Sequence, residues 1–528
     1  MRNFIDRRVV GIACVALVAA GCAKDPLNVV NTNQPEAQRA LSQPADVERL
    51  ISGSFVSWFD GWQNLGINVQ MMNASFEFVG VAANFGMVER SQIPRIQQNN
   101  QVADGFAGQY FATWQNNYRA LSATRNGAAR LTSGTFSLGS PDANSRGLAF
   151  ARLVQGLSLG HLAITYDSAF VVDETSNLDA LQLQPYGAVM TAALSNLDKA
   201  ITEATGKTWS LPSTWINGNA MTAAEFVRFA RSYRARFRAA VARTPAERAA
   251  VNWNEVIADA QGGITQDFSV TADGGTVWYF GPQNILSFPG VWNQITYFLH
   301  GMADTSGAYQ AWMANPDTDG RLPFLIRTPD RRFPQGDLAA QVANPRGLRF
   351  RYKAADGHVR AERGRWRWSF YKYQPAAWDP FWASANFLIG PFVIFQKTEL
   401  DLLAAEGFIR TNRAAQALPL INATRVGVGG LPAATVDGAT GGASCVPRLP
   451  NGTCGSLLET LKWEKRMETM GINYAQFWSD SRGWGDLMVG TQLSYAVPAR
   501  DLATLQLPFY SLGGVGNPGS APLGTYGY

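Results

Sequence analysis

The stretch SLLETLKWEKRMETMGINYAQFWSDSRGWGDL, residues 456–487, is the part around which we expect the rest of the chain to be organised. Its first half places apolar residues near helical spacing, and Gly471 stands where a glycine commonly ends a helix. Trp478, Asp480, Arg482 and Trp484 follow. An arginine can stack on an indole ring and bind a carboxylate through two hydrogen bonds. We therefore predict a packed corner whose charges satisfy one another and close a helical bundle.

Composition and charge exclude several classes of function. The net charge of +5 is small for 528 residues, so no strong polyelectrolyte partner is implied. The three histidines, His161, His300 and His358, are far apart and show no zinc-binding spacing. Motifs of serine or cysteine nucleophiles and of phosphate-binding loops are missing from the sequence. Aromatic residues make up 12%, with 16 tryptophans, which is more than a core needs.

The first 21 residues have the pattern of an export signal. Arg2, Arg7 and Arg8 precede an apolar run, residues 9–20, that is too short to span a bilayer. Small residues come directly before Cys22, as a lipoprotein signal peptidase requires, so we expect a lipid on Cys22. An ordinary secretory signal with a chance cysteine is the alternative. No later run is apolar enough to predict a transmembrane helix, and export argues against nucleic acid as a partner.

Two other cysteines of the mature chain, Cys445 and Cys454, lie close together in a loop rich in glycine and proline. In an oxidising compartment these two would form a local disulfide, and the alternative is two free thiols. Cys14 would be removed with the signal.

Helical periodicity dominates residues 46–265, and the clearest predicted helix covers residues 222–243. One face of it is aromatic, and a neighbouring stripe holds Arg228, Arg231, Arg234 and Arg238. The stripe could bind phosphate groups of a membrane surface or a partner protein. Alternatively, it is a solvated face whose arginine stems cover the next helix. Other helices are predicted from Asp46 onward and over residues 102–131, 146–167, 185–204 and 252–260.

The character of the sequence changes over residues 266–390. Glycine, proline, aspartate and aromatic residues become frequent, and helical periodicity weakens. Strand-like runs occur at residues 276–280 and 348–353, with one helical segment near 290–302. Long irregular insertions held by a helical scaffold commonly carry binding surfaces. Helices are predicted to resume over residues 392–410 and 413–425.

The corner resembles the C-terminal signature of the SusD/RagB family of outer-membrane nutrient-binding lipoproteins. Lys465 replaces the usual arginine, and residues 472–476 depart from the pattern. Residues 393–432 resemble a second segment of the family, and residues 27–35 and 497–508 resemble its start and its end. The matching residues are Glu464, Arg466, Glu468, Asp480, Arg482, Trp484 and Gly485 in the signature, and Glu406, Ala417, Ile421, Asn422, Arg425 and Gly427 in the second segment.

The resemblance implies a mainly α-helical protein of tetratricopeptide-like helical pairs in a curved stack, with a loop-rich insertion and a few short strands. We expect a signal peptide at 1–21, a polar tether at 22–45 and a single body at 46–528. Within the body, residues 46–265 would be the helical half, 266–390 the ligand-facing region and 391–528 the C-terminal segment. The resemblance further implies a lipid anchor in the outer membrane, a SusC-like TonB-dependent transporter as partner, an oligosaccharide or peptide ligand, and neither catalysis nor a cofactor.

The candidate ligand contacts are mostly aromatic residues in loop-like stretches, because sugar rings stack on indole and phenol rings. Each ring is equally compatible with packing in the core. The resemblance also places one early loop near the ligand, and the candidates are Phe85, Arg90, Trp278, Tyr279, Trp292 and Trp312. Two other functions stay open. A secreted glycan-degrading enzyme on a helical scaffold would need two carboxylates across a cleft, and a helical scaffold could instead bind only protein.

Overall fold

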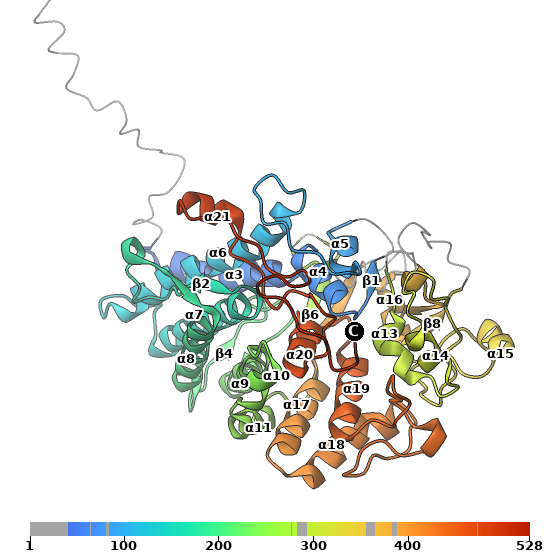
Figure 1. Ribbon diagram of the computed structural model, residues 1–528. Helices are drawn as coiled ribbons and strands as arrows, with labels where there is room; N and C mark the ends of the chain where they lie inside the picture. The colour runs from blue at the N-terminus through green and yellow to red at the C-terminus, as the bar shows by residue number, and fades with distance from the viewer. Residues whose placement is uncertain are drawn as a thin grey trace, which may run out of the picture.

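The computed structural model of the protein describes residues 41–63, 65–80, 84–275, 277–281, 293–354, 365–382, 388–472 and 474–528. Within them the chain is mainly α-helical with a few short strands, which confirms the predicted fold class (Figure 1). The predicted lipid site Cys22, most of the tether and the candidate Trp292 lie outside the described residues.

The first half of the chain is a row of long helices in which each packs on the next. α3 (Pro44–Trp62) packs on α6 (Ala107–Thr132), and α6 packs on α7 (Pro141–Thr165). α7 packs on α8 (Tyr186–Ala204), which packs on α9 (Ala223–Ala240). All these helices were predicted, with ends that differ by a few residues, because their apolar periodicity is strong.

Local sequence explains how α7 and α9 form and meet. Thr222 and Glu225 make reciprocal hydrogen bonds at the start of α9, a capping box that binds two backbone N–H groups at the helix end. Gly160 of α7 lies against the ring of Phe237, and a Cβ atom at Gly160 would fall 2.1 Å from that ring. Only glycine allows the two helices to approach this closely.

α7 is the one helix in the described part of the chain that is long and apolar enough to cross a membrane by length and composition. Of its apolar window, 89% is buried inside the protein. Packing against α6, α8 and α9 therefore accounts for its apolar character.

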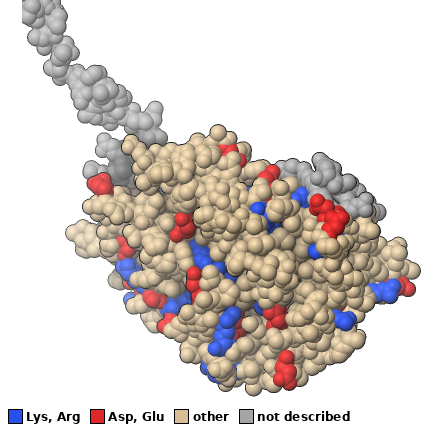
Figure 2. Space-filling model, viewed as in Figure 1, with Lys and Arg blue, Asp and Glu red and all other residues tan. Residues whose placement is uncertain are grey.

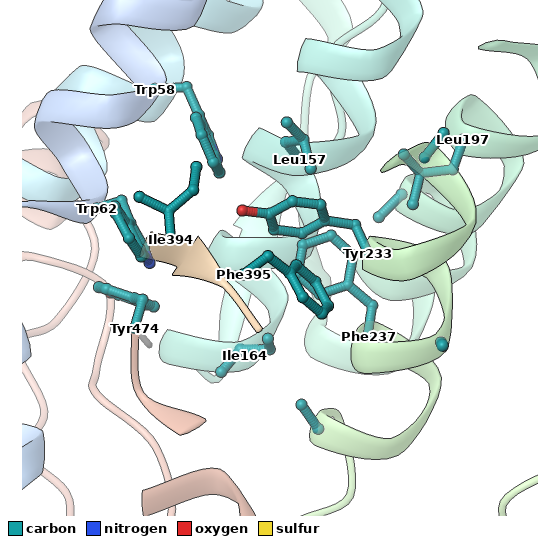
Figure 3. Close-up of a cluster of buried hydrophobic side chains, with 14 of the residues drawn as sticks. Trp58, Trp62, Leu157, Ile164, Leu197, Tyr233, Phe237, Ile394, Phe395 and Tyr474 are labelled. Carbon is teal, nitrogen blue, oxygen red and sulfur yellow. The ribbon is translucent and has the colours of Figure 1, made fainter. Parts of the chain in front are cut away.

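The centre of the core lies where α3, α7, α9 and a strand meet (Figure 3). Trp58 of α3 stacks on His161 of α7, with 5.2 Å between ring centroids, and Tyr233 of α9 meets Trp58 edge-on. Burial holds the pKa of His161 well below its ordinary value, so this ring is neutral. His161 is thus a neutral side chain of the buried core.

The second half continues the stack. α11 (Trp253–Gln261) packs on α9 and on α17 (Lys397–Arg410), and α17 packs on α18 (Ala414–Gly427) and on α19 (Leu457–Thr469). Segments far apart in sequence therefore lie side by side in one body (Figure 1). Gly471, with φ of 70°, follows α19 in the left-handed conformation expected after a helix end.

Two predicted elements in the middle of the chain differ from the structure, one in its start and the other in its type. The predicted helix at 392–410 begins only at Lys397, because residues before it form β10 (Ile389–Phe395), antiparallel to β6 (Phe268–Asp273). Residues 277–280 are not a strand. The Asp273 carboxylate accepts hydrogen bonds from the backbone of Gly275 and Val277 and turns the chain instead.

The remaining elements are short. The strand pairs are β1 (Val79–Gly80) with β7 (Asn293–Gln294), β2 (Ser168–Phe170) with β3 (Leu183–Pro185), β4 (Ser210–Leu211) with β5 (Met221–Thr222), and β8 (Phe350–Tyr352) with β9 (Tyr371–Tyr373). The short helices are α4 (Ile67–Ala74), α5 (Met87–Ser91), α10 (Pro245–Ala249), α13 (Tyr297–His300), α14 (Ala308–Ala314), α15 (Leu338–Ala343), α16 (Asp379–Trp382), α20 (Gln476–Trp484) and α21 (Ala499–Thr504).

Candidate functional site

The corner formed by α19 and α20 contains three groups of buried ion pairs. The first surrounds Arg332, which binds Asp330 through two hydrogen bonds of 2.9 Å. The same guanidinium donates to Glu464 at 2.9 Å and to Glu468 at 3.1 Å. Arg349 donates to the other oxygen of Glu468 at 2.6 Å. All three carboxylates are thus held by arginine side chains.

The second group surrounds Arg248 of α10. Its guanidinium binds Glu406 of α17 in bidentate fashion, at 3.0 and 2.6 Å, and donates to Asp480 at 3.0 Å. Lys465 lies 2.8 Å from the other oxygen of Asp480, and the indole N–H of Trp484 donates to Glu406. Burial alone would raise the pKa of Glu406, but the charge of Arg248 holds it well below its ordinary value.

The third group joins α19 to the chain after α20. Asp486 accepts from Arg466 at 2.5 Å and lies 2.9 Å from the ammonium group of Lys462. Arg466 also lies over the ring of Trp484, 5.1 Å from its centroid, so the predicted stacking of an arginine on an indole occurs here.

Arg482 and Asp480 do not pair with each other as the sequence suggested. Arg482 lies over Trp478 and donates to four backbone oxygens: those of Ala240 and Ala242 at the end of α9, of Ile164 at the end of α7, and of Leu493. The last carbonyl groups of a helix have no partner within it, and a cation is favourable there. Arg482 therefore binds the C-terminal ends of two helices, and Asp480 is left to Arg248 and Lys465.

The corner thus holds the stack together. Each carboxylate in it is occupied by cations or hydrogen-bond donors within the part of the chain that the structure describes. In the neighbouring loop Cys445 and Cys454 are joined by a disulfide that closes a segment with a sequence separation of 9.

Two of the aromatic candidates are core residues. Trp278 is 7% exposed and packs on Phe59, with 4.9 Å between ring centroids. Trp312 is 6% exposed, packs on Phe298 and carries the guanidinium of Arg321 over its ring. Composition alone could not separate such rings from exposed ones, and neither indole offers a free face to a ligand.

Phe85 and Tyr279 are only partly buried and keep exposed area. Phe85 has a positive φ of 54°, rare for a residue with a side chain, and it packs beside the buried Val69 and Met87. Tyr279 packs against the main core cluster. Of the candidate rings in the described residues, these two remain available for contact with a ligand.

Arg90 of α5 is the most unusual of the candidates. It is 4% exposed, its Nε has no hydrogen-bond partner, and its guanidinium forms no ion pair with any described residue. Burying an uncompensated charge is unfavourable. Burial raises the pKa of Tyr110 to about 12 and raises that of Tyr495, and the charge of Arg90 opposes both shifts, so this guanidinium acts on both phenols.

The surroundings of Arg90 are rich in donors. The hydroxyl of Tyr495 and the side-chain amide of Gln492 are buried beside each other, and the amide of Gln492 interacts with the phenol. Arg95, close by, is hydrogen-bonded to backbone oxygens and to Thr491, and it adds a second positive charge. Arg90, Tyr495 and Gln492 together could bind an oxygen-rich ligand group. Sequence reasoning missed the last two because some 400 residues separate them from Arg90 and no local pattern marks them.

A catalytic pair of carboxylates does not stand out. Glu77, before β1, is fully buried and accepts a 2.6 Å hydrogen bond from the backbone of Gly471. Burial raises its pKa to about 8, so it is protonated at neutral pH. Within the described residues we find no second carboxylate paired with it, and no group of three or more metal-ligating side chains.

No family model matches the sequence, and no curated protein matches it. Solved structures do share the fold. A SusD homolog from Bacteroides thetaiotaomicron superimposes with a TM-score of 0.54 at 11% identity, over 91% of this chain and 99% of the other. A SusD-like protein from Bacteroides fragilis gives 0.52 at 12% identity, over 88% and 91%. A SusD superfamily protein from Bacteroides thetaiotaomicron gives 0.51 at 11% identity, over 89% and 94%. The chain therefore has the fold of these proteins from one end of its body to the other.

Proposed function

We propose that this chain, which has the fold of the SusD-like proteins, is itself a cell-surface nutrient-binding lipoprotein of that kind. It would capture oligosaccharides or peptides without catalysis and pass them to a SusC-like TonB-dependent transporter. The observation that carries the proposal is the shared fold over nearly the whole of each chain. The pattern before Cys22, which resembles a bacterial lipoprotein signal, and the C-terminal signature, which resembles the SusD/RagB family, support it.

The ligand contacts that we propose are Phe85, Arg90 and Tyr279, together with Tyr495. The two partly exposed rings would stack on sugar or peptide groups, and the buried guanidinium and hydroxyl would donate to ligand oxygens. Titration calorimetry of the purified full chain against mixed oligosaccharides and peptides tests this. Tyr279→Ala and Phe85→Ala should weaken binding, whereas Phe509→Ala, an exposed ring elsewhere, should leave it unchanged. Equal effects of all three variants would refute the assignment.

The absence of catalysis is tested by incubating the chain with the same oligosaccharides and measuring new reducing ends. Turnover that disappears when one carboxylate is replaced would show that the protein is an enzyme. The anchor and the partner are tested in the native host. Cys22→Ala should release the chain from the outer membrane, and detergent extracts of the unaltered chain should contain a TonB-dependent transporter bound to it.

A further inference from the structure

The arginine stripe of α9 is divided into two halves with different surroundings. Arg234 donates to Asp259 at 2.8 Å and also pairs with Asp198. Arg238 donates to Asp259 at 3.2 Å and also pairs with Glu255. This half of the stripe is neutralised by carboxylates from α8 and α11. Figure 2 likewise shows positive and negative side chains interspersed on one face of the molecule.

The other half of the stripe is not neutralised. Arg228 is exposed and Arg231 is half-buried, and neither forms an ion pair with the described residues. Both line a cavity of about 510 Å³ between the end of α8, α9 and the end of α11, and Lys207 also lines it. The other lining residues are uncharged, so three cations face one cavity that contains no acidic side chain.

The walls of this cavity are fixed by backbone contacts. The hydroxyl of Ser232 accepts from the N–H of Ile264 at 2.9 Å and donates to the oxygen of Arg228 at 2.8 Å, which holds the loop after α11 on α9. Arg231 lies directly over Gly262, where a Cβ atom would come within 2.5 Å of its Nη1. The cavity is therefore largely preformed, with Arg231 held against its wall.

The helix ends beside the cavity do not balance the cations. A helix C-terminus carries roughly half a negative charge, so α8 and α11 together contribute about −1 against three positive charges. The carbonyl groups at these ends already accept from backbone N–H groups, including those of Thr205, Lys207 and Gly262. A smaller adjoining cavity, which Arg228 also lines, contains Glu225 and Asp267. Glu225 accepts from the N–H and the hydroxyl of Thr222, and Asp267 accepts from the N–H of Lys397. The larger cavity itself is lined by cations and uncharged residues alone.

We propose that this cavity binds a tetrahedral oxyanion of the phosphate or sulfate class, with Arg228, Arg231 and Lys207 as its ligands. A phosphate monoester carries −1.5 to −2 at neutral pH and three acceptor oxygens, so it can accept from all three cationic side chains at once. The hydroxyl of Thr265, also in the lining, can donate to the same group. With no aromatic ring in the lining, the cavity suits an anionic group rather than the face of a sugar.

Equilibrium dialysis of the full chain against radiolabelled inorganic phosphate at low ionic strength tests the proposal. We expect saturable binding of one phosphate. Arg228→Gln and Arg231→Gln should each weaken it about tenfold, since each removes a charge-assisted contact. Arg238→Gln is the matched control, because it removes the same charge from the same helix and should change the affinity less than about twofold. No saturable binding, or an equal loss in all three variants, would overturn the proposal.

The source of the anion is distinguished by competition. A lipid headgroup is identified if vesicles of phosphatidylglycerol displace phosphate from the wild type and if Arg231→Gln binds these vesicles more weakly. Vesicles without effect, with phosphate binding retained, would identify a free or small-molecule anion. Displacement by polyglutamate at lower concentration than by phosphate would instead show that the cavity receives an acidic segment of a partner protein, and the oxyanion assignment would be wrong.

Discussion

Replacing Arg482 by alanine tests whether the C-terminal corner holds the helical stack together. The guanidinium of Arg482 donates to four backbone oxygens at distances of 2.7 to 3.1 Å. Two of the acceptors, Ile164 and Leu493, also accept from Arg243 and would keep a partner in the variant. Those of Ala240 and Ala242 would lose the donor that Arg482 provides.

A buried acceptor left without a donor costs about 1–3 kcal/mol, so the two oxygens together imply about 2–6 kcal/mol. Part of this cost is offset, because burying the charged guanidinium of Arg482 is itself unfavourable and the variant no longer does so. Burial first, and then the charges of Arg243 and Arg248, hold the pKa of Arg482 well below its ordinary value. We expect the free energy of unfolding to fall by about 3 kcal/mol.

Urea unfolding of the full chain, followed by tryptophan fluorescence, measures this change. Arg238→Ala is the matched control. Its partner Glu255 is exposed, and the buried Asp259 keeps its hydrogen bonds from Arg234, so the loss should be about 0–1 kcal/mol. Arg482→Lys keeps the charge but reaches fewer oxygens, so its stability should lie between those of the wild type and Arg482→Ala. The reasoning is refuted if Arg482→Ala destabilises the chain no more than Arg238→Ala does.

The other predictions concern two buried carboxylates and the disulfide. Glu406→Gln leaves Arg248 without its bidentate partner and should lower the free energy of unfolding, measured in urea, by about 3–5 kcal/mol. Because the folded pKa of Glu406 is depressed, the stability that Glu406 contributes is present above about pH 4.5 and is lost as the pH falls. Glu77 has a raised folded pKa of about 8, so the wild type loses stability as the pH rises from about 4.5 to 8, whereas Glu77→Gln does not. The melting temperature of Glu77→Gln should therefore rise relative to that of the wild type over this range. A difference in melting temperature that does not depend on pH would contradict this. Replacing Cys445 and Cys454 by serine opens a short loop and should lower stability by about 2–3 kcal/mol, and equal urea midpoints for the variant and the wild type would contradict it.

Local signals predicted most of the helices and little of the pairing between distant segments. The long helices follow from apolar periodicity, which is a property of a few consecutive residues. The pairing of β6 with β10 joins segments more than 100 residues apart, and the sequence near residues 392–395 suits a helix or a strand equally until its partner is known. The predicted start of the helix at 392–410 was wrong for that reason.

The candidate site shows the same division. The corner was expected from a cluster of charged and indole side chains. The partners of Arg482, however, are backbone oxygens, and because every residue has one, the residue types in the sequence do not show which oxygens it binds. Trp278 and Trp312 were candidates because aromatic residues serve both cores and binding surfaces, and only packing separates the two roles. Arg90 was a candidate because the family resemblance places its segment, predicted as a loop, near the ligand. The structure puts Arg90 in α5, and the lack of an ion pair with any described residue became visible only in three dimensions.

The hydrogen bonds from Arg482 to the ends of α7 and α9 also affect the order in which the chain can fold. Both helices leave the ribosome well before Arg482 is synthesised, since Ala240 precedes it by more than 240 positions. Until then the terminal peptide groups of these helices face solvent or a chaperone, and the early half of the chain is an unfinished intermediate.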